Sequence, residues 1–133
     1  MKQTPLLIVI FALAFGNIQA QCQTALKAKS ENYVEGSALM HQEITDEKTE
    51  IPVVLNAKLT YGFYIFAKAG NSPPNVKFYA ANGNLIEDKK LNFNKEANFR
   101  YWKFQAPASG KYKLVLENPD NHCALYVLSF ISQ

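Results

Sequence analysis

Residues 99–117 decide the fold, and they read FRYWKFQAPASGKYKLVLE. Large apolar side chains recur at every second position, with Trp102 and Phe104 before the segment APASG and Tyr112 and Leu114 after it. A period of two is typical of β-strands, whose successive side chains point to opposite faces. The proline, serine and glycine of APASG favour a turn. The stretch therefore predicts two strands joined by a turn.

Two further strands are predicted before this stretch. Residues 60–68, TYGFYIFAK, carry apolar side chains on both faces, so this strand is either buried on two sides or carries exposed aromatic residues. Residues 51–55 also alternate, and Pro52 within them has no amide hydrogen to donate. This strand is therefore expected to begin at Pro52 or to lie at the edge of a sheet.

Other runs of strand length lie between turn-forming residues. They are residues 76–80 and 85–86, which flank the turn dipeptide Asn82-Gly83, and the nearly all-apolar residues 123–131. The chain shows no convincing long helix. About seven or eight short strands with regularly spaced turns predict an all-β fold, a single antiparallel, jelly-roll-like β-sandwich over residues 44–133.

Residues 1–20 form a segment of their own. Lys2 precedes an almost entirely apolar run over residues 5–15, and Ala20 is a small residue at a possible cleavage point. This pattern predicts a secretory signal peptide cut after Ala20, and the run is too short to span a membrane. A lipoprotein is the alternative, but lipid attachment needs a cysteine directly after the cut, and Gln21 precedes Cys22. We expect an exported protein, periplasmic or extracellular, and not an integral membrane protein.

Two cysteines, Cys22 and Cys123, follow the predicted cleavage point. An even pair in an oxidising compartment predicts a disulfide bond, here between the start of the mature chain and its last strand. The chain-entropy account gives about 4–5 kcal/mol of stabilisation for so long a loop. Two unpaired thiols are the alternative.

Residues 21–43 carry the weakest structural signal. They fit a short helix that ends near Gly36, or irregular chain that leads into a first strand near residues 37–44. The residues that would share one side of the helix are Ala25, Leu26, Lys29 and Tyr33. The charged residues 46–50 predict a solvated turn.

Three stretches resemble the bacterial pre-peptidase C-terminal domain: residues 55–61 (LNAKLTY), residues 76–83, and residues 102–114 (WKFQAPASGKYKL). The family pattern has a glycine before the tyrosine of the first strand, where this chain has Leu59 or Thr60. The resemblance implies an exported β-sandwich with tyrosine and phenylalanine side chains plugging its core. It also implies secretion, adhesion, or carbohydrate and matrix contact, with no chemistry.

Catalytic and metal-binding motifs are not found. His41 and His122 lie outside any nucleophile motif, and His122 and Cys123, as strand neighbours, point to opposite faces. The polar residues near the histidines lack zinc or calcium spacing, although Asp120 lies in the kind of turn that holds calcium in some sandwich modules. We expect no catalytic residue, metal or cofactor. A net charge of +3 without a basic run predicts no nucleic-acid partner.

Aromatic residues make up 13% of the chain, and some of them fall on the strand faces opposite the predicted core. These are the ligand-binding candidates: Tyr64, Phe66, Tyr79 and Tyr101. If two or more line up across neighbouring strands, they form a surface that stacks on sugar rings or meets a protein partner. The alternative interpretation is that residues 21–43 cover them.

Three hypotheses for function follow. The favoured one is a non-enzymatic, exported binding or adhesion module that contacts carbohydrate or an envelope protein. The alternative is a structural or accessory envelope protein that assembles with a partner, for which an exposed sheet edge at residues 51–55 would be suited. The third is a small hydrolase, which would need His41 or His122 in a pocket with a carboxylate and a nucleophile.

Overall fold

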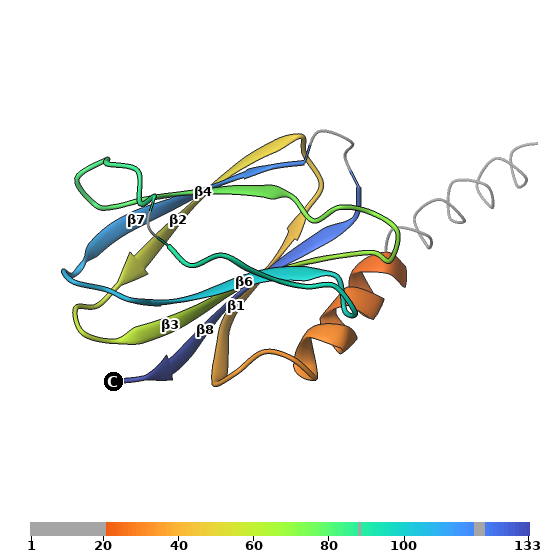
Figure 1. Cartoon of the computed structure of the whole chain (residues 1–133), viewed down its shortest axis with the longest axis horizontal. Coiled ribbons are helices and arrows are strands. Elements are labelled where there is room, and N and C mark those ends of the chain that lie inside the picture. Colours follow the sequence, from red (N-terminus) through yellow and green to blue (C-terminus); the bar gives the residue numbers. More distant parts are fainter. Residues whose placement is uncertain (1–20, 88, 119–121) are drawn as a thin grey trace, which may run out of the picture.

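The computed structural model describes residues 21–87, 89–118 and 122–133 (Figure 1). The signal-peptide prediction and Asp120 lie outside these residues. The strands of the described part are β1 (Ser37–Ile44), β2 (Lys48–Leu55), β3 (Thr60–Ala67), β4 (Asn75–Tyr79), β5 (Asn92–Asn94), β6 (Phe99–Gln105), β7 (Gly110–Glu117) and β8 (Ala124–Ser132).

The strands form two sheets. Sheet A has the order β1-β8-β3-β6-β5 and sheet B the order β2-β7-β4, and every pairing is antiparallel. The prediction of an all-β antiparallel sandwich is confirmed. The order is that of a jelly roll in which β5 has paired with β6 at the edge of sheet A.

The core between the sheets is largely aromatic. Trp102 and Phe63 are fully buried and stack with their ring centroids 4.8 Å apart, and Phe78 of sheet B packs on Phe63 at 5.1 Å. The hydroxyl of Tyr126 is buried in this core without a hydrogen-bond partner among the described residues, and burial raises the pKa of Tyr126. The alternating apolar positions of residues 99–117 thus supply side chains of this core.

β3 is buried on both faces, which decides between the two interpretations of residues 60–68. Its outward-facing side chains lie under a helix of residues 21–31, drawn in orange in Figure 1. Gly36 follows the helix with a φ of 80°, where a Cβ would collide with the carbonyl oxygen of Phe130, and β1 begins at the next residue. Residues 21–43 thus form a helix that ends at residue 31, a short connection, and most of β1.

β2 is an edge strand of sheet B, as Pro52 predicts. Pro52 lies in the middle of this strand and not at its start, because β2 already begins at Lys48, opposite Glu117 of β7. The expectation of a charged turn over residues 46–50 is therefore wrong for residues 48–50, which belong to β2. Pairing with the far end of β7 extends the strand, and a local charge pattern does not report such a contact.

Candidate functional site

The predicted aromatic surface does not form as a set of four. Tyr64 and Phe66 of β3 are 3% and 0% exposed, because the helix of residues 21–31 covers the outer face of sheet A. Tyr101 is half-buried beside them, with its ring stacked on Tyr64 at 6.1 Å. Tyr79 lies on β4, in the other sheet. The assignment of Tyr64 and Phe66 to an exposed ligand surface is thus corrected by their burial.

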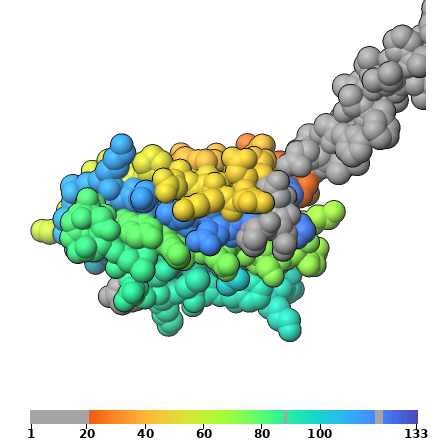
Figure 2. All heavy atoms as spheres, turned by 90° about the horizontal axis from the view of Figure 1, so that it is seen from above, coloured from red at the N-terminus to blue at the C-terminus, as the bar shows by residue number. Residues whose placement is uncertain are grey.

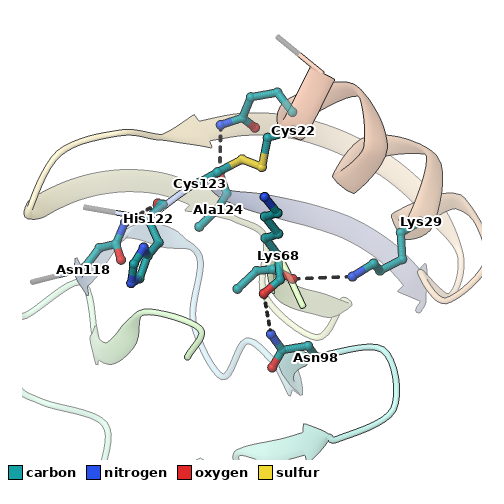
Figure 3. The surroundings of a disulfide bond; sticks show 10 residues. Cys22, Lys29, Lys68, Asn98, Asn118, His122, Cys123 and Ala124 are labelled. Atoms are coloured by element: carbon teal, nitrogen blue, oxygen red, sulfur yellow. Dashed lines mark hydrogen bonds between the residues drawn. A yellow bond between two sulfur atoms is a disulfide. The ribbon is translucent and has the colours of Figure 1, made fainter. Parts of the chain in front are cut away.

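The helix is fixed to sheet A by several kinds of contact. A disulfide joins Cys22 to Cys123 just before β8, as the cysteine count predicts (Figure 3). Leu26 is 3% exposed in the apolar cluster beneath the helix. The ammonium group of Lys29 donates to the carbonyl oxygens of Ala67 (3.4 Å) and Ala97 (3.1 Å). This face is therefore closed by the chain itself.

The segment after the helix adds two polar contacts. The amide of Glu35 donates a hydrogen bond to the hydroxyl of Tyr64 (3.0 Å), so the polar end of this buried ring is satisfied. The carboxylate of Glu35 pairs with Lys103 of β6 at 2.5 Å, and the hydrogen bond to Glu35 raises the pKa of the exposed Lys103. Tyr64 thus serves to hold the covering segment.

The outer face of sheet B is open by contrast. Figure 2 shows it with β2 in yellow, β7 in blue and β4 in green. Alternate residues of β2 are exposed along its length, and Val54 is 72% exposed. No described residue covers this face as the helix covers sheet A.

One row of residues crosses all three strands of sheet B. Lys113 of β7 lies opposite Pro52 of β2 on one side and Tyr79 of β4 on the other. Its ammonium group stands 5.1 Å from the centre of the Tyr79 ring and 4.0 Å from the carboxylate of Glu50. A cation over an aromatic face is held by the ring quadrupole. The row combines an apolar edge, a half-exposed ring and two opposite charges.

This row lines an open groove of about 580 Å³, together with Lys111 and the turn after β4. Tyr79 is the one sequence candidate in it. The lysines and Glu50 were not predicted as site residues, because only the register of β2 and β4 on β7 brings them together. The sequence offered one signal for these residues: they occupy the outward-facing alternate positions of β2 and β7.

The residues that carry the family resemblance hold turns. The hydroxyl of Tyr61 accepts a hydrogen bond from the amide of Asn56 (2.9 Å), and that of Tyr112 donates to the carbonyl of Ala108 (2.7 Å). The hydroxyl of Ser109 accepts from the amide of Ala57 (2.7 Å) and so joins two turns that are distant in sequence. These three hydroxyl groups therefore hold turns and maintain the fold.

The chain resembles a pre-peptidase C-terminal domain. In a search of the solved structures it matches the crystal structure of this domain from a collagenase of Bacillus anthracis. The two are 15% identical, with a TM-score of 0.46, and the match covers 72% of this chain and 89% of that one. This is the family that the three sequence stretches resemble. No protein-family model and no curated protein matches the chain.

The histidines take no part in a recognisable catalytic arrangement of the described residues. His41 lines a shallow groove with Glu43 and Thr24, and no hydrogen bond joins these three side chains. The carbonyl of His122 accepts a hydrogen bond from the side chain of Asn118 (2.7 Å, Figure 3). The part of the chain that the structure describes contains no group of three or more metal-ligating side chains and no helix suited to cross a membrane.

Proposed function

We propose that this protein is a non-enzymatic, exported binding module, and that its ligand surface is the groove on the outer face of sheet B. The observation that carries the proposal is the row of Pro52, Lys113 and Tyr79 across three rigid strands. Strands of a sandwich fix side-chain positions better than loops do, so a ligand would meet a preformed surface.

The groove suits a saccharide. The half-exposed ring of Tyr79 offers a flat apolar surface on which the C–H face of a sugar can lie. Lys111, Lys113 and Glu50 at the same groove supply donors and acceptors for hydroxyl groups.

A glycan array tests this function on the disulfide-bonded protein. We expect binding to one class of glycan, and Tyr79→Ala is expected to weaken it roughly two- to tenfold, the size of an aromatic contact. Tyr33→Ala is the matched control, since its ring is also partly exposed, at 41%, but packs on Phe99 of sheet A. Absence of glycan binding, or equal losses in both variants, would contradict a saccharide site at Tyr79.

A second function is favoured by the free edge of β2. An edge strand presents unpaired backbone groups that another strand can extend, and the exposed Val54 adds an apolar contact there. The protein would then act as an accessory envelope protein that pairs with a partner. A photo-crosslinking residue at position 54 tests this in the native envelope, and the lack of any crosslinked protein would count against it.

The proposed export of residues 21–133 rests on the N-terminal segment and on the disulfide, which forms in oxidising compartments. Mass spectrometry of the exported chain should give an N-terminus at Gln21. An N-terminus at a lipid-modified Cys22 would replace this proposal by the lipoprotein alternative.

A further inference from the structure

Arg100 on β6 is the only arginine in the sequence. It is half-buried near the start of β6, where this strand pairs with the edge strand β5. Its Nε atom is buried and has no hydrogen-bond partner among the described residues. All ion pairs of the described part use lysines, so no described carboxylate neutralises Arg100.

An exposed aromatic ring lies next to this cation. The guanidinium carbon of Arg100 is 5.6 Å from the centre of the Phe93 ring, and Phe93 remains 50% exposed. The ring limits how far the guanidinium can swing, because the cation is attracted to its face. Apolar surface and an unpaired cation are thus held side by side.

Arg100 and Phe93 line a cleft of about 420 Å³. The loop between β3 and β4 also lines it and contributes Asn71 and Ser72. Lys95 adds a second positive charge and Glu96 one negative charge, so the charged lining is net positive.

The walls of this cleft are tied together. Asn98, which adopts a φ of 58°, donates from its side-chain amide to the carbonyl oxygens of Lys68 (3.0 Å) and Asn71 (2.6 Å). The side chain of Asn94 accepts a hydrogen bond from the amide of Ala97 (2.9 Å), which fixes the turn before β6. A cleft held in this way is preorganised for a ligand.

We propose that this cleft binds a saccharide that carries a carboxylate, a uronic-acid unit, with the carboxylate on Arg100 and the sugar ring against Phe93. The planar guanidinium offers parallel N–H donors that match the two oxygens of a carboxylate. Bound there, the carboxylate accepts hydrogen bonds from the terminal N–H groups of the guanidinium and supplies the missing counter-charge. The site is separate from the groove around Tyr79 because it lies on sheet A, so it does not depend on the function proposed above.

Nuclear magnetic resonance tests the site directly, because a chain with a single arginine gives a single arginine Nε–H signal. We expect oligogalacturonate to shift this signal in a saturable manner, while a neutral galactose oligosaccharide and sodium chloride at matched ionic strength leave it in place. An unshifted signal, or an equal shift with the neutral sugar, would overturn the proposal.

Two variants make the test specific. Arg100→Lys keeps the charge but loses the paired donors, so the affinity for oligogalacturonate should fall about tenfold or more. Phe93→Ala should weaken the binding of oligogalacturonate several-fold while the Nε–H signal of Arg100 remains. This variant tests the site even if Arg100→Lys does not fold. Leu39→Ala is the matched control, because it removes an exposed apolar side chain (57%) on β1, at the opposite edge of sheet A, and it should bind oligogalacturonate like the wild type. Full affinity in both Phe93→Ala and a folded Arg100→Lys would place the sugar elsewhere.

Discussion

The two outer faces of the sandwich differ in what lies on them. The face of sheet A is rich in aromatic side chains, and the helix of residues 21–31 covers it. The face of sheet B carries lysines, glutamates and Tyr79, and alternate residues of β2 along it are solvent-exposed. The difference shows that the more aromatic face is closed to solvent where the helix covers it. It is a second, smaller core that the chain itself completes.

The largest expected effect comes from cutting the covalent link to the helix. The disulfide closes a sequence separation of 101 residues, so a Cys22→Ser/Cys123→Ser double variant should lose up to about 4–5 kcal/mol in the free energy of unfolding. It should also bind a hydrophobic dye, since the cover of sheet A is no longer tethered. Urea unfolding and dye fluorescence check both. An unchanged midpoint would mean that the helix docks without the link.

A pair of truncations compares the two faces more finely. Leu26→Ala removes a buried side chain under the helix and should cost about 2–5 kcal/mol. Val54→Ala on sheet B should change stability by less than about 0.5 kcal/mol, because its side chain is already in solvent. Chemical denaturation of both variants is the measurement. Similar losses would contradict the contrast between a covered and an open face.

The smallest expected effects come from two tyrosine hydroxyls in different settings. Tyr64→Phe removes the partner of the Glu35 amide and should cost about 1 kcal/mol. Tyr126→Phe should be neutral or stabilising, because this buried hydroxyl has no partner among the described residues. Urea midpoints at neutral pH measure both, and a loss in Tyr126→Phe as large as in Tyr64→Phe would contradict the assignment.

The same pair differs in alkali. Burial raises the pKa of Tyr126, so above the unfolded pKa of about 10 the hydroxyl ionises in the unfolded chain while it stays neutral in the folded protein, and the stability of the fold decreases as the pH rises. The drop in the urea midpoint from about pH 8 to about pH 11 should therefore be smaller in Tyr126→Phe than in the wild type. An identical drop would show that other groups control alkaline unfolding.

Much of the fold was predictable from local pattern. The alternation in residues 99–117 placed Trp102 and Tyr112 in the core, and Pro52 gave a sheet edge as one of two positions for its strand, the one that the structure has. The candidate site was less accessible. Tyr79 was predicted as a candidate because it lies on the strand face opposite the core. Lys113 can be recognised as a site residue only from its pairing with Tyr79 and Pro52. In the sequence, Arg100 has no feature that distinguishes it from other strand residues. Only the positions of the loops around it show that it lines a cleft.

The sequence by itself determined most of the strands, their inward faces, several turns and the cysteine pair, because these follow from periodicity and residue chemistry over a few neighbouring positions. It did not indicate β5, and its strand at residues 85–86 is only an isolated bridge. Only the tertiary structure decided which outward aromatic rings are surface. Tyr64, Phe66 and Tyr79 carry the same local signal, and a helix more than thirty residues away along the chain buries the first two and not the third. Covering one face of a sheet and setting the register between distant strands are non-local choices. They depend on apolar area and on covalent tethering, which no short stretch of sequence contains.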